Sequence, residues 1–220
     1  PFPDVTFDAV VSNHSLEHIE GWQRAVAEFG RVLKTGGALY VAVPDTSTVT
    51  DRLYRWLSRG GGHINAFYRP EEVSGPVSRL TGLPWNGTRV LHSSLSFLHP
   101  ANRPPGRPPR KLWLLGGGGR RFLFLWNFAA RWLDRHFHTR LSVYGWAFYF
   151  GRHREVDETP LVHVCLRCGS GHAPGSLRTG SRRKWGLIPT WNCPACEEEN
   201  PAYPPLEPRT EADGRSGLRE

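Results

Sequence analysis

All four cysteines of the 220-residue chain occur as two C-x-x-C pairs, Cys165/Cys168 and Cys193/Cys196, with 24 residues between the pairs. This spacing predicts a zinc ribbon, in which four thiolates converge tetrahedrally on one ion, because a tight turn presents both sulfur atoms of a pair to the metal. Gly169, directly after the first pair, suits such a turn. A closed four-thiolate site has no open coordination position, so we expect structural rather than catalytic Zn²⁺.

Two disulfides, or a redox-active C-x-x-C, would use the same four cysteines. No signal-peptide pattern precedes the first predicted strand, which favours a reducing, cytoplasmic compartment, and neither pair opens a thioredoxin-like helix. No stretch reaches the ~18 unbroken apolar residues that a membrane-spanning helix requires. These points favour a metal site over disulfides.

A strand, a helix and a second strand follow one another at the start of the chain. Residues 7–12 (FDAVVS) read as a buried strand of a parallel sheet. The next segment has one apolar stripe at helical spacing, formed by Trp22, Val26, Phe29 and Leu33. Lys34 in the last turn, followed by Gly36 and Gly37, predicts the end of this helix, and residues 38–43 (ALYVAV) predict the next strand. The pattern predicts a right-handed parallel unit of an α/β sheet.

Residues 7–19 (FDAVVSNHSLEHI) and 28–37 (EFGRVLKTGG) carry a resemblance to a known family. They resemble the class I S-adenosylmethionine-dependent methyltransferases of the type-11 group, whose pattern is fDaVvs…leHi…E..RvLkpGG.l.v.vP. The similarity extends over residues 2–45 and continues more weakly through residues 63–73 (HINAFYRPEEV). It implies a seven-stranded Rossmann-like sheet, of which this chain holds strands 4–7, with the cofactor at the C-terminal ends of the strands.

The resemblance also implies where S-adenosylmethionine binds. Asn13 and His14, directly after the first strand, match positions that line the methionine end of the cofactor, and Ser15, Leu16 and His18 lie beside them. Methyl transfer from a sulfonium needs mostly orientation and desolvation from the protein. The catalytic residue is unknown at this stage, since His14 and His18 are equally typical of polar loop residues satisfied by backbone groups.

Two departures from the family pattern shape the functional hypothesis. The glycine-rich loop after the first family strand and the acidic residue ending the second should lie upstream of Pro1, so we interpret the chain as a C-terminal portion that binds the cofactor weakly alone. The run Gly116–Gly119 does not follow a strand and does not replace that loop. Residues 13–16 (NHSL) differ from the Asn/Asp-Pro-Pro-aromatic string of amino-methyltransferases acting on nucleobases or glutamine, so we expect a small-molecule, lipid or saccharide acceptor.

The net charge of the chain is concentrated in one segment. Residues 99–140 hold nine Lys and Arg against Asp134 alone, a net charge of +8 that equals that of the whole chain. The segment separates two further predicted strands, residues 89–98 and 141–151, and contains a predicted aromatic helix over residues 121–136. The predicted apolar face of this helix consists of Phe122, Leu125, Trp126, Ala129, Leu133 and His136.

Three interpretations of this basic helix stay open. It docks on the sheet with its arginines in solvent, it makes peripheral contact with an anionic membrane, or it forms a lid over a lipid-like or aromatic acceptor. Nucleic acid is not an expected partner, because the segment has no interleaved aromatic and basic stacking platform.

The sequence therefore predicts three parts. Residues 1–155 form the C-terminal part of a methyltransferase domain with the insert 99–140, residues 160–200 form a zinc-ribbon-like segment, and residues 201–220, rich in Pro and charge, form a disordered tail. The leading hypothesis is that the protein is a methyltransferase. We expect it in the cytoplasm, in contact with a membrane if the helix over residues 121–136 binds one. The alternative is a non-catalytic scaffold that recruits a partner through the ribbon and the basic helix.

Overall fold

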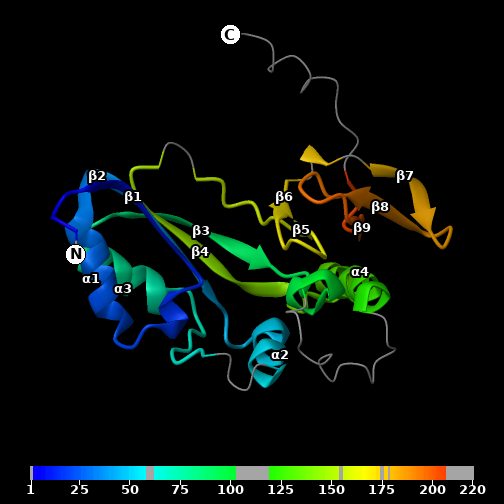
Figure 1. Ribbon diagram of the computed structural model, residues 1–220, viewed down its shortest axis with the longest axis horizontal. Coiled ribbons are helices and arrows are strands. Elements are labelled where there is room, and N and C mark those ends of the chain that lie inside the picture. The colour runs from blue at the N-terminus through cyan, green and yellow to red at the C-terminus, as the bar shows by residue number, and fades with distance from the viewer. Residues whose placement is uncertain are drawn as a thin grey trace, which may run out of the picture. The chain divides into compact units, whose positions relative to one another are not determined.

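The computed structural model describes residues 2–57, 62–102, 119–153, 156–173, 176–177 and 179–206, and the chain divides into two compact units (Figure 1). The sheet unit comprises Pro1–Ser93 and Arg140–Pro160. The cysteine unit comprises Ser94–Thr139 and Leu161–Glu220. Each unit is therefore built from two stretches of sequence, and the chain passes from one unit to the other three times.

The sheet unit contains four strands in the order β1-β2-β4-β3. β1 (Phe7–Asn13) pairs in parallel with β2 (Leu33–Pro44), and α1 (Trp22–Val32) connects them. β4 (Val143–Gly151) runs antiparallel to β2 and to β3 (Trp85–His92) and lies between them, although it comes last in the sequence. The predicted strand–helix–strand unit and the antiparallel end of the sheet are confirmed, and the fold is a mixed α/β sheet.

Helices cover one face of this sheet. α1 packs against α3 (Glu71–Thr81), and Figure 1 shows the two side by side, while α2 (Val49–Leu57) lies near one end of the strands. Alternate residues of β2 and β4 point into this layer because side chains along a strand alternate between faces. The buried core consists of Leu16, Trp22, Val26, Leu33, Leu39, Val41, Val43, Phe67, Val73, Val77, Trp146, Phe148 and Phe150. On the opposite face Val11 keeps 69% of its surface exposed.

The helix α1 ends two residues earlier than the sequence pattern predicts. Leu33 already has extended backbone angles, and Lys34 lies on β2, where its Nζ is 2.9 Å from both carboxylate oxygens of Asp8. Gly36 does adopt the left-handed conformation (φ 75°), but within β2, where the pairing with β1 shifts register. Gly36 and Gly37 therefore lie at the register shift between β1 and β2 and do not end the helix. Lys34 forms an ion pair with Asp8 on β1 and does not lie in the last turn of the helix.

The predicted strand at residues 89–98 lies at residues 85–92 instead. His92 pairs with Val143, the first residue of β4, so the partner strand ends there. Beyond it Leu95 takes a left-handed conformation (φ 54°), and η2 (Ser96–Leu98) and η3 (Pro100–Asn102) are short 3-10 helices. β3 therefore ends where β4 offers no further residue to pair with. The sequence of residues 89–98 alone does not contain this information.

The cysteine unit consists of short antiparallel strands and one long helix. β5 (His163–Val164) pairs with β6 (Gly171–His172), and β7 (Thr179–Lys184), β8 (Ile188–Asn192) and β9 (Glu199–Pro201) form a three-stranded sheet. Its small core consists of Cys165, Leu177, Trp191, Cys193 and Ala202, with Cys196 and Leu206 packed against it. Residues 201–206, which the sequence assigns to a disordered tail, thus contribute to this unit, and residues 207–220 lie outside the described residues.

The basic helix, α4 (Gly119–Phe137), belongs to the cysteine unit and contacts β9 and η2. Its buried residues are Leu123, Phe124, Asn127, Ala130 and Arg131. The face predicted as apolar is instead the more exposed one, with Leu125 at 48% exposure. Arg131, expected in solvent, is only 2% exposed. The Pro/Arg tract at 103–110 and the glycines at 116–118 lie outside the described residues.

Among the described residues, no helix combines the length and the apolar character that crossing a bilayer requires.

Replacing Gly145 by Ala tests how closely β4 packs beside β2 in the sheet. A Cβ at Gly145 would overlap the carbonyl oxygen of Val43 and lie 2.8 Å from Pro44 Cα, both backbone atoms that cannot move alone. We expect Gly145→Ala to lower the free energy of unfolding of the sheet unit by about 2 kcal/mol or more, measured by urea unfolding. Gly75→Ala is the control, because nothing lies within 4 Å of its Cβ. An equal loss in both variants would contradict the close packing of β4 on β2.

Candidate functional site

A polar segment follows β1 directly. Asn13 is the exposed last residue of the strand. His14 has a left-handed backbone (φ 50°), its backbone N–H donates to Ala42 O (3.0 Å), and its ring lies 4.9 Å from that of Tyr144. The chain thus turns sharply at the C-terminal end of β1, and the His14 side chain is directed toward β4.

The next residues of this segment are tied to a distant part of the chain. The backbone N–H groups of Ile64 and Asn65 donate to Glu17 O at 2.8 and 3.0 Å. The Asn65 side chain donates in turn to Leu16 O and Ile19 O at 2.7 and 2.8 Å. The short helix η1 (Leu16–His18) is therefore fixed against residues 64–65 by four hydrogen bonds.

Leu16 and Ser15 take different roles from their histidine neighbours. The Leu16 side chain is fully buried in the core of the sheet unit. Ser15 Oγ is 2.7 Å from Ser12 Oγ, so the hydroxyl is bonded to its own strand. Of the five residues predicted to line the cofactor, Asn13 and His18 are exposed, His14 and Ser15 are half-buried, and Leu16 is buried.

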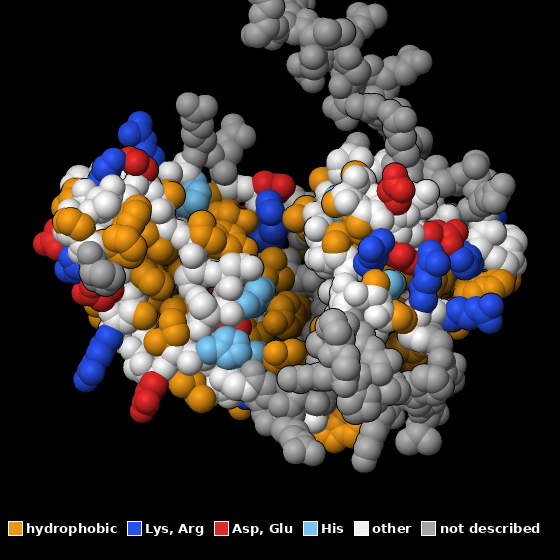
Figure 2. All heavy atoms as spheres, viewed as in Figure 1, with side chains coloured by type: hydrophobic (Ala, Val, Ile, Leu, Met, Phe, Trp, Pro, Cys, Tyr) orange, Lys and Arg blue, Asp and Glu red, His pale blue; other side chains and the backbone are white. Residues whose placement is uncertain are grey.

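His18, His63 and the Asp51 carboxylate gather at this segment. His18 Nδ1 is 2.9 Å from Gly62 O, and the His18 and His63 rings meet edge to face at 4.7 Å. His63 Nδ1 is 3.1 Å from Asp51 Oδ1, and Arg55 Nε donates to Asp51 Oδ2 (2.5 Å). Figure 2 shows histidine side chains gathered on the surface near this end of the sheet. The cluster joins η1, α2 and residues 62–65.

Burial shifts the protonation of three groups beside this cluster, His14, Glu17 and Tyr144, toward their neutral forms. It lowers the pKa of His14 to about 4, aided by repulsion from His63 and His18. It raises the pKa of the Glu17 carboxyl and of the Tyr144 hydroxyl above their usual values. Neither carboxylate oxygen of Glu17 has a hydrogen-bond partner among the described residues, and His14 Nδ1 lies 3.8 Å away. His14 is therefore an uncharged ring near neutral pH.

Sequence reasoning finds only part of this cluster. Asn13, His14 and His18 come from one local motif, whereas Asp51 and His63 arrive from α2 and from the loop after it. The signal for His63 is the weak continuation of the family pattern that begins at that residue. No sequence signal marks Asp51, because an acidic residue in the first turn of a helix is common at the surface.

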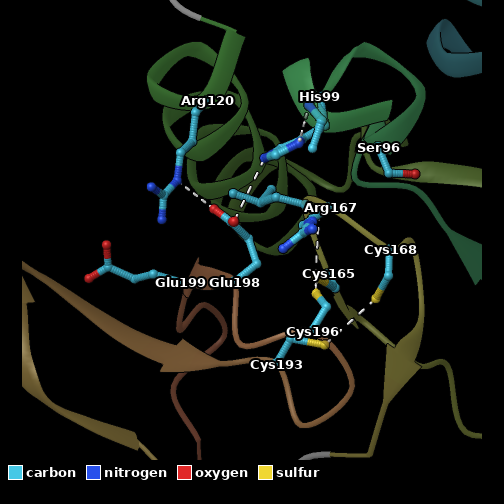
Figure 3. Close-up of polar contacts among 12 residues, drawn as sticks. Ser96, His99, Arg120, Cys165, Arg167, Cys168, Cys193, Cys196, Glu198 and Glu199 are labelled. Carbon is cyan, nitrogen blue, oxygen red and sulfur yellow. Dashed lines mark hydrogen bonds and ion pairs between the residues drawn. The ribbon is translucent and has the colours of Figure 1, made fainter. Parts of the chain in front are cut away.

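The second candidate site is formed by the four cysteines (Figure 3). Cys165 Sγ is 3.5 Å from Cys196 Sγ, and Cys168 Sγ is 3.7 Å from Cys193 Sγ. The four sulfur atoms all lie within 4.8 Å of one another, and the four cysteines form no disulfide. Sulfur atoms held tetrahedrally at the ~2.3 Å Zn–S distance lie about 3.8 Å apart. The arrangement is therefore compatible with zinc.

The two C-x-x-C turns have the same backbone geometry. Cys165 O accepts from the N–H of Gly169, and Cys193 O accepts from the N–H of Glu197, four residues on in each case. The N–H of each leading cysteine donates one residue further, to Ser170 O and to Glu198 O. The residue directly after the second cysteine has a left-handed backbone in both turns, with φ 75° at Gly169 and 61° at Glu197. The turn predicted for Gly169 is confirmed.

Polar groups surround the sulfur atoms. Asn200 Nδ2 lies 3.8 Å from Cys165 Sγ, and His172 Nε2 lies 3.4 Å from Cys193 Sγ. Burial raises the pKa of the Cys165 thiol. At Cys168 burial also acts to raise the pKa, but hydrogen bonds with Ser170, Cys165 and Cys193 outweigh this and bring it to about 7. The site thus stabilises thiolate at its more exposed side.

An ion pair between exposed Arg120 and the buried carboxylate of Glu198 connects this site to α4. Glu198 is only 8% exposed, and Arg120 Nε donates to its Oε1 (2.5 Å) while His99 Nε2 lies 3.8 Å from its Oε2 (Figure 3). Ser94 Oγ donates to Cys165 O (2.6 Å), and Asn127 Nδ2 donates to Ser94 O (2.9 Å). The helix and the cysteine turns are therefore fixed to each other by several separate hydrogen bonds.

Comparisons with known proteins concern mainly the first of these sites. Residues 1–41 match the family described as "Methyltransferase domain". The match covers β1, η1, α1 and most of β2, and so includes the whole polar segment after β1. It covers no part of the cysteine unit.

One curated relative is ajmaline N-methyltransferase of Rauvolfia serpentina, 29% identical over 91 residues, or 38% of this chain. The chain covers 31% of the length of that relative. Similar solved structures include a SAM-dependent methyltransferase of Thermotoga maritima, described as a possible histamine N-methyltransferase (18% identity, 70% of this chain and 59% of that one, TM-score 0.39). Another is a SAM-dependent methyltransferase of Archaeoglobus fulgidus (12% identity, 68% and 61%, TM-score 0.39).

Glu198→Gln tests the ion pair between Glu198 and Arg120. The amide keeps the shape of the side chain but removes the charge that faces Arg120 and His99, so we expect the cysteine unit to lose about 1–3 kcal/mol of stability. Hydrogen exchange of the α4 and β8 amides measures this loss. Glu197→Gln is the matched control, since it removes the same charge from the exposed neighbouring residue. Similar exchange in the two variants would show that the pair does not hold α4.

Proposed function

We propose that the chain is the C-terminal part of an S-adenosylmethionine-dependent methyltransferase. The observation that carries the proposal is the match of residues 1–41 to a methyltransferase domain, because these residues fold as the parallel β1–α1–β2 unit. Ligands of open α/β sheets bind at the C-terminal ends of the strands, where the segment after β1 places its polar side chains. The sheet order, with β4 inserted antiparallel, agrees with the predicted end of a methyltransferase sheet.

Bound S-adenosylmethionine supplies a methyl group on a sulfonium. In the proposed function Asn13, His14 and His18 contact its methionine end, Ser15 supports the turn, and Leu16 contributes through its position in the core rather than through an exposed side chain. The pKa of about 4 makes His14 a weak base at neutral pH. The ring therefore supports orientation of the cofactor rather than removal of a proton from the acceptor.

The acceptor proposed is a small molecule, a class that includes lipid-like and saccharide compounds. Support comes from the curated relative, which is named for N-methylation of ajmaline. Peripheral membrane contact through residues 121–136 stays a prediction. Its support is the set of large apolar side chains that α4 leaves exposed, Leu125, Trp132 and Phe137.

We also propose that the four cysteines hold one structural Zn²⁺. The sulfur distances fit the geometry of such a site, and the two identical turns present the sulfurs from opposite sides. The core of the cysteine unit is small, so a metal would supply folding energy that apolar burial does not. The zinc would then also order α4, which is bonded to the first turn through Ser94 and to the second through Glu198.

The methyltransferase proposal is tested by calorimetry with S-adenosylhomocysteine. We expect weak binding to this chain and tighter binding to a form extended upstream with its own coding sequence. His14→Asn should weaken the tighter binding at least tenfold, about 1.4 kcal/mol, because it removes the imidazole while Asn tolerates the left-handed backbone. His153→Asn, in the loop after β4, is the control.

Absence of binding by both forms would reject the methyltransferase and favour the scaffold. Equal binding by His14→Asn and the parent protein would reject the placement of the cofactor.

Replacing Cys165 by Ser tests the zinc proposal. We expect the zinc content, measured by elemental mass spectrometry, to fall by about one ion per chain relative to the parent. Amide protection should be lost in β5–β9 and also in α4, since the helix packs on the cysteine turns. The amides of β2 and β4 should keep theirs, because those strands belong to the sheet unit.

Ser176→Ala, near the same strands, serves as the control for the cysteine change. A parent chain free of zinc, or retained protection of α4 in the variant, would contradict the proposal.

A further inference from the structure

Glu17, His18 and His63 bring one ligand atom each to within 4.8 Å of one another at the C-terminal end of β1. From this grouping we propose that the sheet unit contains a second metal site, which binds a divalent transition-metal ion. The site is separate from the four cysteines, because its residues come from η1 and from the loop before α3. It also does not coincide with the residues predicted to bind the cofactor, apart from His18.

The polar contacts of both histidines are made through Nδ1, which leaves Nε2 of each ring available to a metal ion. His18 Nδ1 lies 2.9 Å from Gly62 O, a carbonyl that can only accept, so this nitrogen carries the proton. His63 Nδ1 lies 3.1 Å from the Asp51 carboxylate, which favours the same tautomer. In both rings Nε2 then keeps its lone pair. A backbone carbonyl or a carboxylate behind the ring is the usual support of a metal-binding histidine.

The third ligand is the buried carboxylate of Glu17, and His14 Nδ1 lies 3.8 Å from its Oε1. The side chain of Glu17 is 1% exposed, and neither of its oxygens has a hydrogen-bond partner among the described residues. A buried carboxylate without partners is costly by several kcal/mol when ionised. The charged neighbour Arg55 does not relieve it, since its guanidinium is bonded to Asp51, His63 O and Asn65 O. A cation beside Glu17 and the two histidines would supply the missing partner.

The backbone around the site is held before any ion arrives. Glu17 O accepts from the N–H groups of Ile64 and Asn65, so the carboxylate and the loop that carries His63 are fixed to each other. His18 lies next to Glu17 on η1. Ligands positioned in this way lose little entropy on binding an ion.

Two imidazoles and one carboxylate select the class of metal. This donor set suits Mn²⁺, Fe²⁺, Co²⁺ and Zn²⁺ better than Mg²⁺ or Ca²⁺, which prefer oxygen ligands. Three protein ligands leave coordination positions open for water or for an oxygen or nitrogen of a second molecule. If the proposed methyltransferase function holds, that molecule is the methyl acceptor, and this consequence alone rests on that function.

Cobalt binding tests the site directly. The chain is first loaded with one equivalent of Zn²⁺, which the four thiolates bind in preference to a site with nitrogen and oxygen ligands. It is then titrated with Co²⁺, followed by calorimetry and by visible absorption. We expect one Co²⁺ per chain with weak d–d bands typical of nitrogen and oxygen ligands. Thiolate-bound Co²⁺ gives instead a strong near-ultraviolet charge-transfer band, so the spectrum separates this site from the cysteines.

Two ligand variants and one control complete the experiment. Glu17→Gln keeps the buried shape, and His18→Gln alters an exposed residue, so both should fold; each should weaken Co²⁺ binding at least tenfold. Glu20→Gln removes an exposed charge nearby and should bind as the parent chain does. A parent chain that shows only the thiolate band, or equal binding in all three variants, overturns the proposal. Calorimetry with S-adenosylhomocysteine is independent of this readout, so failure of the metal site and failure of the methyltransferase remain distinguishable.

Discussion

Two buried aspartates that need cationic partners hold together the part of the sheet unit around the C-terminal end of β1. Asp45 is fully buried and accepts hydrogen bonds from Ser47 and from Arg140, which lies 95 residues away in the sequence. Asp51 is equally buried and is paired with Arg55 and His63. Breaking such a pair leaves an ion in an apolar surrounding at a cost of several kcal/mol. These two aspartates therefore fix the start of α2, the loop before α3 and the entry to β4 around the segment that follows β1.

Polar contacts also explain why the buried face of α4 differs from the face that the apolar periodicity predicts. Asn127 turns inward because its amide donates to Ser94 O and to Leu123 O. Arg131 turns inward as well, and its Nη2 donates to Val164 O (3.1 Å). Periodicity measures only apolar content, so a helix that docks through polar side chains is assigned the wrong face. The docking partners lie more than thirty residues away or on another segment, where no local pattern records them.

What the sequence predicts well is therefore local. The strands around residues 7–13 and 143–151 follow from runs of apolar residues, and the convergence of the cysteines follows from their spacing. The pairing of Asp51 with His63, by contrast, depends on the path of the loop between α2 and α3. The end of β3 also depends on a distant segment. β3 stops at His92 because its partner there, Val143, is the first residue of β4. Long-range contacts decide these features, and single-sequence patterns contain little information on them.

The order of strands in the sheet has a consequence for how the chain acquires its structure during synthesis. Among the strands that the structure describes, β3 is joined to the sheet only through β4, which is made some fifty residues later, after all of α4. Until residue 151 leaves the ribosome, the edges of β2 and β3 that β4 will fill stay unpaired, and such edges invite association with other chains. Meanwhile α4 is complete but lacks the cysteine turns on which it packs. A ribosome pausing between residues 93 and 143 would therefore hold two half-built units at once.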